Sequence, residues 1–412
     1  MATLLIKNAT LVTPKGKNSL KGYEMNKLHI ENNAALFARD GIIEYVGPTS
    51  SCPTSNADEI IDAQGKVMLP GFVDSHTHLI FGGFRPDEFE WRMKGDSYMS
   101  IMERGGGIQS TVNATREASL KELVKKGEWF INRMVDMGIT TVEAKSGYGL
   151  SLESELKMLE AINCLAENPE RKLKVISTFL GAHAVPKEYK GRTGEYVDLI
   201  IKEMLPAVKG KAKFCDIFTE KNVFEIEDSR RLLTAAKEMG FDLKLHADEI
   251  VTLGGAELAG ELGAVSADHL LHVSDEGIKK MAEAGTVATL LPLTAFSLKE
   301  PFAPARKFIE AGAAVALATD LNPGSCFSGS IPLTIALACI YMNMSVEETI
   351  TALTLNGAAA CGIADKTGSL EVGKDADVVL LHFDNYKVLP YYVGMNCVET
   401  VISEGKIVAR NH

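Results

Sequence analysis

The chain has 412 residues, of which 46% are hydrophobic and 24% are charged, and its formal net charge is −11. Its length is about two to three times that of a typical domain and its composition is that of an ordinary globular protein, so we expect one large domain with a smaller one. The negative charge argues against nucleic acid as a partner, because its phosphates would be repelled. It does not argue against a small anionic substrate, which one local cation can bind.

Both ends of the chain predict β structure. Short β-rich runs broken by Gly, Asn and Asp occupy residues 3–14, 35–47, 59–70, 375–383 and 397–409. Because the ends of a central domain commonly lie close together, we predict that these runs form one small β-sandwich domain from residues 1–66 and 365–412. Separate β-structured additions at the two ends are the alternative.

Between these runs, residues 67–364 alternate between strand-like and helix-like patterns. The candidate strands are residues 68–76, 138–145, 173–183, 213–220, 241–249, 264–272, 285–292 and 313–324. Helical patterns separate most of them, as in residues 151–167, where apolar residues recur at spacings of three and four. The alternation predicts an α/β fold with eight parallel strands and crossover helices, a TIM-type (β/α)8 barrel, with a doubly wound open sheet as the alternative.

Polar residues close several of these strands, where a packed core would hold another apolar residue. His76 and His78 alternate in "DSHTH", so on a strand they would share one face. Later strands end at His246, His269 and Asp320. Catalytic groups of a TIM barrel gather where the strands end, and imidazole and carboxylate ligands suit zinc or iron. We therefore predict a metal site, although hydrogen-bonded structural histidines explain the first pair equally well.

On these residues and several longer motifs, the chain resembles the imidazolonepropionases of the amidohydrolase superfamily over nearly its whole length. The motifs are residues 81–116, "EAKSGYGL" (143–150), "LGAHAVP" (180–186), "LHADE" (245–249) and "ATDLNPGS" (318–325). The segment 81–116 is the most discriminating, because many hydrolases share the histidine pattern. The resemblance implies metal-dependent hydrolysis of the cyclic amide of 4-imidazolone-5-propanoate to N-formimidoyl-L-glutamate, a step of histidine degradation.

The resemblance also implies the residues of the site. One divalent metal, Zn²⁺ or Fe²⁺/Fe³⁺, would be bound by His76, His78, His246 and Asp320. Substrate contacts would be made by Arg85, Tyr148, His183, Glu249, Asn322, Gly324 and Ser325. His269 matches the catalytic-site histidine of the family. Position 325 holds Ser where many relatives hold Thr, so the hydroxyl is kept.

The chemistry of these side chains suggests their roles. Glu249 is predicted to act as general acid or base toward the departing ring nitrogen, and Asp320 to accept a proton from the attacking water. His269 would hold that water or polarise the carbonyl, although it could instead only orient another group. The guanidinium of Arg85 matches the propionate of the substrate. Tyr98 would help to hold the same carboxylate, or lie in the core.

The expected partner is therefore a small-molecule substrate, with neither nucleic acid nor a membrane, and the resemblance alone implies a homodimer. Seven cysteines without a CxxC pair are typical of a reducing compartment, which predicts a cytoplasmic protein. The alternatives within the superfamily are another cyclic amidase and a nucleobase-type deaminase. Arg85 argues against a nucleobase, which has no carboxylate. A non-catalytic barrel protein is the third alternative.

Overall fold

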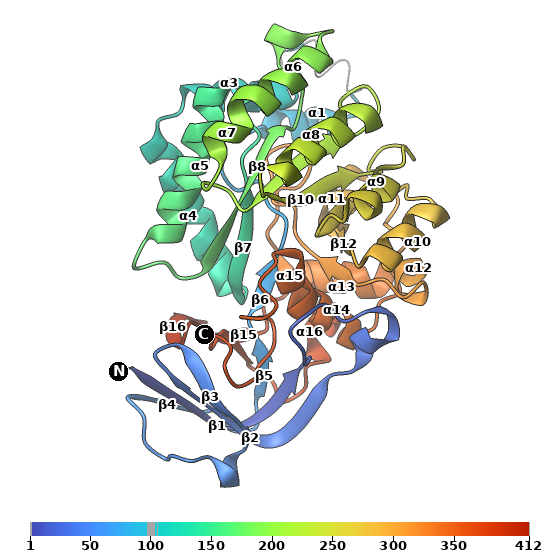
Figure 1. Ribbon diagram of the computed structural model, residues 1–412. Helices are drawn as coiled ribbons and strands as arrows, with labels where there is room; N and C mark the ends of the chain where they lie inside the picture. Colours follow the sequence, from blue (N-terminus) through green and yellow to red (C-terminus); the bar gives the residue numbers. More distant parts are fainter. Residues whose placement is uncertain (1, 97–103, 105, 412) are drawn as a thin grey trace.

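The computed structural model describes residues 2–96, 104 and 106–411, and its main body is a sheet of eight parallel strands (Figure 1). In chain order the strands are β6 (Phe72–Asp74), β7 (Ile139–Lys145), β8 (Lys174–Ala182), β9 (Phe214–Thr219), β10 (Asp242–Ala247), β11 (Ser266–His269), β12 (Val287–Leu290) and β13 (Val315–Leu317). Each strand pairs in parallel with the next one in the sequence. This is the order expected when crossover helices join successive strands.

Backbone hydrogen bonds just beyond β6 and β13 bring the first and last strands of this sheet together. The amide of Asp320 donates to the carbonyl of His76 over 3.0 Å, and the amide of His78 donates to the carbonyl of Leu321 over 2.9 Å. The sheet therefore curves into a nearly closed barrel, and the TIM-type fold predicted from the sequence is confirmed. The two bonds also place the His76–His78 segment directly beside Asp320.

The described part of the chain also forms helices, most of which lie around the barrel (Figure 1). They are α1 (Pro86–Met93), α3 (Ile108–Glu117), α4 (Leu120–Asp136), α5 (Leu152–Glu167), α6 (Thr193–Leu199), α7 (Leu205–Val208), α8 (Ile226–Glu238), α9 (Gly255–Leu262), α10 (Asp275–Ala284), α11 (Pro292–Leu298), α12 (Ala305–Glu310), α13 (Ile331–Tyr341), α14 (Val346–Leu353), α15 (Leu355–Ala360) and α16 (Val388–Tyr391). The start of α4 illustrates how the sequence sets them: Ser119 and Glu122 form a reciprocal capping box. Its Leu123 and Met134 are buried in the main core.

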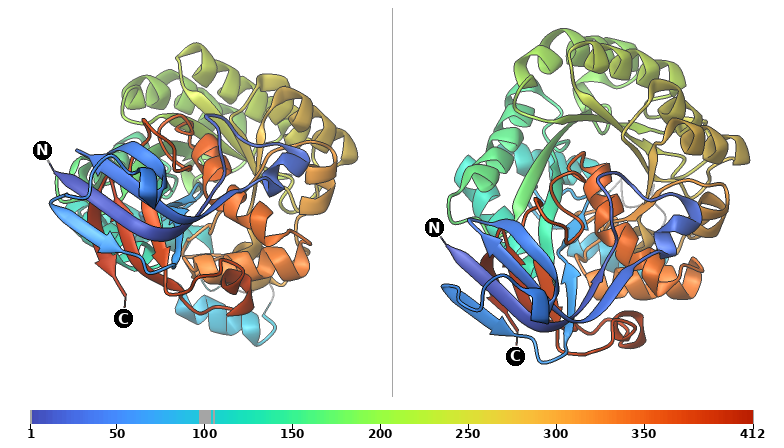
Figure 2. Two further views of the ribbon diagram at one scale, coloured as in Figure 1. Left: turned by 90° about the horizontal axis from the view of Figure 1, so that it is seen from below. Right: turned by 60° about the horizontal axis from the view of Figure 1, so that its bottom comes forward.

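The two ends of the chain build a second sheet (Figure 2). Its strands are β1 (Thr3–Thr13), β2 (His29–Arg39), β3 (Ile42–Pro48), β4 (Glu59–Asp62), β5 (Val67–Pro70), β14 (Val378–Leu381), β15 (Val398–Ser403) and β16 (Lys406–Arg410). Their order is β16-β15-β14-β5-β1-β2-β3, with β4 beside β1. Leu4 and Leu36 from the N-terminal part meet Val378 and Ile402 in one apolar cluster. The expected β unit shared by both ends is confirmed, as one continuous sheet around this core.

The predicted strand 68–76 is two short strands that belong to different sheets. β5 pairs with β1 and β14, whereas β6 pairs with β7. The expectation that His76 and His78 lie on a strand is wrong, because β6 ends at Asp74. The domain limits at residues 66 and 365 stay a prediction.

Among residues 2–96, 104 and 106–411, none of the helices combines the length and the apolar character needed to cross a membrane.

Candidate active site

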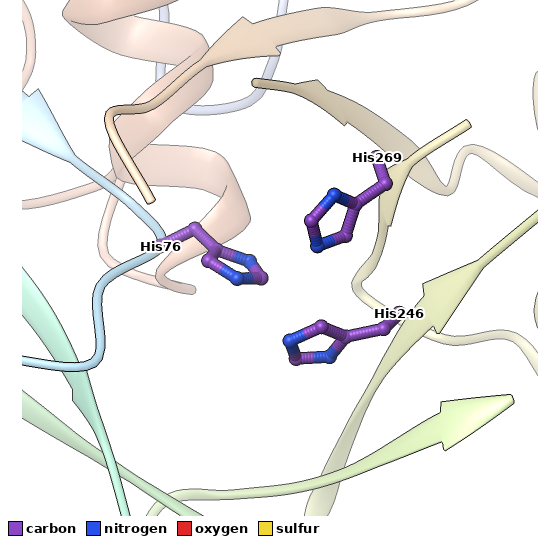
Figure 3. A group of neighbouring side chains, drawn as sticks. All are labelled: His76, His246 and His269. Carbon is purple, nitrogen blue, oxygen red and sulfur yellow. The ribbon is translucent and has the colours of Figure 1, made fainter. Parts of the chain in front are cut away.

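Four histidines and one aspartate from distant parts of the chain meet at the carboxyl ends of the barrel strands. His76 and His78 come from the segment after β6, His246 from β10, His269 from the end of β11, and Asp320 from the segment after β13. All five side chains are buried. Figure 3 shows the rings of His76, His246 and His269 pointing toward a common centre.

The distances within this cluster suit a tetrahedral metal. The Nε2 atoms of His78 and His246 lie 3.4 Å apart, and Asp320 Oδ1 lies 3.5 Å from Nε2 of both His76 and His78. Ligands about 2.0–2.1 Å from a tetrahedral zinc lie about 3.3–3.4 Å from one another. These three distances among the predicted ligands are therefore close to the spacing that such an ion requires.

Several polar atoms of the cluster have no hydrogen-bond partner among the residues that the structure describes. They are His76 Nε2, His78 Nδ1, both ring nitrogens of His269, and Asp320 Oδ1. Burying a polar atom without a partner is costly. A cation bound between His76 Nε2 and Asp320 Oδ1 would satisfy both, so the donor set fits a divalent metal.

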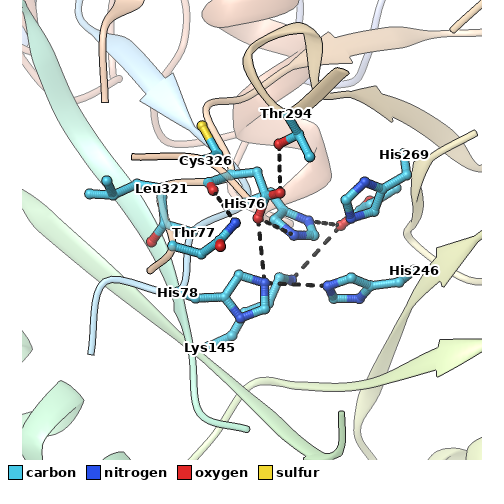
Figure 4. A network of polar contacts seen from close by, with 12 residues as sticks. His76, Thr77, His78, Lys145, His246, His269, Thr294, Leu321 and Cys326 are labelled. Carbon is cyan, nitrogen blue, oxygen red and sulfur yellow. Dashed lines mark hydrogen bonds and ion pairs between the residues drawn. The ribbon is translucent and has the colours of Figure 1, made fainter. Parts of the chain in front are cut away.

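Carboxylates behind two of the histidines fix which ring nitrogen faces the cluster. Asp268 Oδ2 lies 2.6 Å from Nδ1 of His76, and Asp216 Oδ1 lies 3.1 Å from Nδ1 of His246. Each Nδ1 therefore donates its proton to a carboxylate, which leaves the Nε2 lone pair free for a metal. The ammonium of Lys145, which Figure 4 shows beside this cluster, lies 2.8 Å from Asp216 and 3.8 Å from Asp268.

The electrostatics keep most of these imidazoles neutral, as metal ligands must be. Burial lowers the pKa of His76, His78 and His269 well below the ordinary value. Burial also acts to lower the pKa of His246, but the Asp216 carboxylate outweighs it and leaves that pKa raised. Burial raises the pKa of Asp320 to about 6, and a hydrogen bond of 2.7 Å from the Thr294 hydroxyl to Oδ2 leaves Oδ1 facing the histidines.

Two residues of the cluster have left-handed backbones, which are rare outside glycine. The φ angle is +76° at His269 and +55° at Asp320. Such conformations cost about 1–3 kcal/mol each and persist where the surrounding structure imposes them. At Asp320 the imposing contact is the backbone hydrogen bond to His76.

A cavity of about 440 Å³ opens beside the cluster, a size that suits a small molecule. The predicted site residues that line it are His78, Arg85, Tyr148, His183, His246, Glu249, His269, Asp320, Asn322, Gly324 and Ser325. The sequence therefore predicted most of the polar wall of this cavity. His76 lies behind that wall, and Tyr98 lies outside the described residues.

Glu249 follows β10 and faces His269 across the cavity. Its Oε1 lies 3.6 Å from His269 Nδ1, and burial raises its pKa to about 8, with the Asp320 carboxylate adding to the effect. The raised pKa favours the protonated form of Glu249, which can donate a proton. The adjoining backbone is held by Glu220, which accepts a hydrogen bond of 2.8 Å from the amide of Ile250.

The "SGYGL" loop after β7 carries Tyr148 into the cavity. The buried carboxylate of Glu155, in α5, accepts hydrogen bonds from the amides of Gly147, Gly149 and Leu150 at 2.8–3.0 Å. A Cβ at position 149 would lie 2.6 Å from the amide nitrogen of Glu155, so the glycine lets the loop approach the helix. These hydrogen bonds therefore fix the loop against α5.

His183 at the end of β8 is oriented by the same loop. Its Nδ1 donates to the carbonyl of Gly147 over 3.0 Å, and its ring stacks on that of His78 with centroids 4.9 Å apart. Burial lowers the pKa of His183 to about 3. Its Nε2 is therefore an unprotonated acceptor in the cavity wall.

Arg85 precedes α1 and lies against the turn after β13. Its side chain is only 9% exposed, and Nη1 lies 3.4 Å from the carboxylate of Glu88. A Cβ at Gly324 would lie 2.0 Å from Arg85 Nη2, so the glycine makes room for the guanidinium. This is a physical reason for the glycine in "LNPGS".

The side chain of Asn322 is used within its own turn. Its Oδ1 accepts hydrogen bonds of 2.8 Å from the amides of Gly324 and Ser325, and its Nδ2 donates to the carbonyl of Asp320. The backbone amides of Gly324 and Ser325, two of the residues predicted to contact the substrate, are therefore already hydrogen-bonded within the turn. The hydroxyl of Ser325 also lies 2.9 Å from Asn322 Nδ2.

Sequence reasoning missed several residues of the site. They are Glu88 and Arg92 in the cavity wall, the two carboxylates Asp216 and Asp268, and Thr294 beside Asp320. The sequence could have indicated Arg92 as a site residue, because it follows Arg85 by seven residues, which is two helical turns. The sequence could also have indicated Asp268, because it adjoins His269 in a buried strand, where a charged side chain needs a partner.

Comparisons with known proteins agree with this geometry. Residues 67–408 match the model of the amidohydrolase family. A protein of Phocaeicola vulgatus named imidazolonepropionase is 61% identical over 410 residues, which cover 99% of each chain. A protein of the same name from Bacteroides thetaiotaomicron is 60% identical and also covers 99% of each chain.

A solved structure shares the fold at much lower identity. The adenosine deaminase of Xanthomonas campestris with bound zinc superposes with a TM-score of 0.71 at 19% identity, over 98% of this chain and 92% of that chain. The family match and the nearly full-length relatives lead to one conclusion: the chain belongs to the amidohydrolase family, in its imidazolonepropionase branch.

Proposed function

We propose that this protein hydrolyses the cyclic amide of 4-imidazolone-5-propanoate to N-formimidoyl-L-glutamate, a step of histidine degradation. The observation that carries the proposal is the convergence of His76, His78, His246 and Asp320 beside a cavity that also holds Arg85. The name of the relatives that are about 60% identical points to the same reaction.

We infer that His76, His78, His246 and Asp320 hold one divalent metal, either zinc or iron. Imidazole and carboxylate ligands suit both ions. When bound, such an ion lowers the pKa of a water molecule from 15.7 to about 7 and so provides a nucleophile at neutral pH. Asp268 and Asp216 orient two of the imidazoles from behind.

The side chains around the cavity account for the proton movements. Hydrolysis joins a water oxygen to the ring carbonyl carbon, and Asp320 accepts the proton that this water loses. His269, neutral and facing the cavity, holds the water or polarises the carbonyl oxygen. The ring C–N bond then breaks, and the departing nitrogen takes the proton that Glu249 carries at neutral pH.

Residues on the opposite side of the cavity would orient the substrate. Arg85 can bind the propionate through two parallel hydrogen bonds, and Tyr148 and His183 border the space where the ring would lie. A nucleobase has no carboxylate to meet Arg85, so this geometry favours the imidazolone over a deaminase substrate.

Turnover of 4-imidazolone-5-propanoate, followed by its absorbance, tests the proposal. We expect hydrolysis by the metal-loaded protein, its loss after chelation, and its return when zinc or iron is added back. Metal analysis of the purified protein accompanies the assay and distinguishes the two ions. Full turnover in the chelated, metal-free protein would refute the metal-dependent reaction.

A further inference from the structure

Helix α1 brings a second guanidinium to the cavity. Arg85 precedes the helix, and Glu88 and Arg92 follow at spacings of three and seven residues, which place all three side chains on one face. All three line the cavity beside Tyr148 and Gly324. Two cations and one carboxylate therefore face the same enclosed space from one short helix.

The carboxylate of Glu88 does not neutralise both cations. Glu88 Oε2 accepts a hydrogen bond of 3.0 Å from the amide of Gly107 and lies 3.4 Å from Arg85 Nη1. Asp96 also borders the cavity, but it pairs with Arg104 at 2.9 Å. The face of α1 thus keeps a net positive charge.

Arg92 makes a hydrogen bond that holds its side chain in place, but not every N–H group of its guanidinium has a partner among the described residues. Its Nη2 donates to the carbonyl of Gly324 over 3.3 Å, the residue whose missing side chain also makes room for Arg85. Within the described part of the chain, Arg92 Nη1 and Arg85 Nε are buried without a hydrogen-bond partner. Burial lowers the pKa of Arg92 and the neighbouring Arg85 lowers it further, as expected where like charges are forced together.

We propose that Arg92 is a second substrate-binding residue, which holds the propionate carboxylate together with Arg85. The inference rests on the proposed function and deepens it. A carboxylate between the two guanidiniums would offset their repulsion and provide acceptors for their free N–H groups. The pair would then select substrates that carry a carboxylate at this end and reject neutral ones.

The kinetic test compares Arg92→Met with Lys94→Met, which removes the same charge from an exposed position at the end of α1. Hydrogen bonds to charged groups contribute about 1.5–3 kcal/mol, so we expect Arg92→Met to raise KM by about 10- to 100-fold. The value of kcat should stay within about threefold, because the reacting atoms are untouched. Arg92→Lys should restore part of the affinity, and Lys94→Met should behave like the unmodified protein.

A binding measurement separates this inference from the proposed function. Calorimetry would compare imidazole-4-propanoate with 4-propylimidazole, two ring compounds that differ in the carboxylate. We expect the unmodified protein to bind the carboxylate compound at least tenfold more tightly, and Arg92→Met to lose most of that preference. If the preference is unchanged in Arg92→Met, Arg92 does not bind the carboxylate.

The remaining outcomes are also decisive. Normal turnover with an unchanged KM in Arg92→Met would overturn the inference and leave the proposed function standing. Absent turnover with a carboxylate preference that depends on Arg92 would overturn the proposed function and keep the carboxylate site.

Discussion

At the scale of single residues, the sequence identifies the side chains that reach the site but not the residues that hold them. The polar residues near the strand ends predicted a cluster of histidines with Asp320, although His76 and His78 lie beyond β6 and not on it. The partner of His76 was not predictable, because Asp268 lies 192 residues away. The sequence pattern alone does not show a contact between residues so far apart in the chain.

Asp268→Asn tests the support behind His76. The substitution removes the charge that holds His76 Nδ1–H and weakens the Nε2 donor, so we expect metal affinity to fall by about 10- to 100-fold. Competition with a chelator measures this. Asp242→Asn, at the exposed start of β10, is the matched control. Equal affinities in the two variants would remove Asp268 from the site.

Glu249→Gln tests the proton donor. We expect kcat to fall by about 10²–10⁴-fold while the metal is retained, because the amide cannot transfer a proton. The raised pKa of Glu249, about 8, means that the acid form dominates below that pH. Activity should therefore decline as the pH rises through about 8, and this decline should be absent in the variant. A variant with normal kcat would place the proton donor elsewhere.

At the scale of elements, the alternating pattern located all eight barrel strands, because helical patterns separate most of these short buried segments. It could not divide residues 68–76 between two sheets, since β5 and β6 are both fully buried, follow each other closely in the chain and differ in the strands they pair with. It also could not foresee that the glycines of the "SGYGL" loop approach Glu155 of α5. Both features depend on tertiary contacts, which the local sequence pattern does not show.

Gly149→Ala tests the role of that loop. The added methyl group would lie 2.6 Å from a backbone nitrogen of α5, so the loop must shift and take Tyr148 with it. Misplacement of about 1 Å can cost about 100-fold, and we expect kcat/KM to fall by about 10- to 100-fold at full metal content. Gly194→Ala, in α6 with open space around it, should leave kcat/KM unchanged. Equal kinetics in both variants would show that the loop position is unimportant.

At the scale of the whole molecule, an ion pair joins the barrel to the sheet of the two termini. Lys174 in β8 contacts Asp377 at 2.5 Å and Asp375 at 3.1 Å, next to β14. The side chain of Lys174 is only 15% exposed. Composition and strand patterns predict both units but give no information about this contact between them.

Lys174→Met should destabilise the protein by about 3 kcal/mol, because two carboxylates lose their shared partner. Burial alone would lower the pKa of Lys174, but Asp377 and Asp375 outweigh it and raise that pKa. The stabilisation is therefore complete below the unfolded lysine pKa of about 10.4 and is lost as the pH rises through the folded value. Unfolding midpoints across pH measure this, with the exposed Lys172→Met as control. A difference that persists at the most alkaline pH would contradict the ion pair.

The sheet built from both termini has a consequence for protein synthesis. Leu4 and Leu36 leave the ribosome early, but Val378 and Ile402, which share their core, are added roughly 20–70 s later at typical translation rates. During that interval the nascent N-terminal strands expose apolar surface that chaperones and aggregation compete for. The speed at which the intervening barrel segment is translated therefore becomes a determinant of how much functional enzyme a cell recovers.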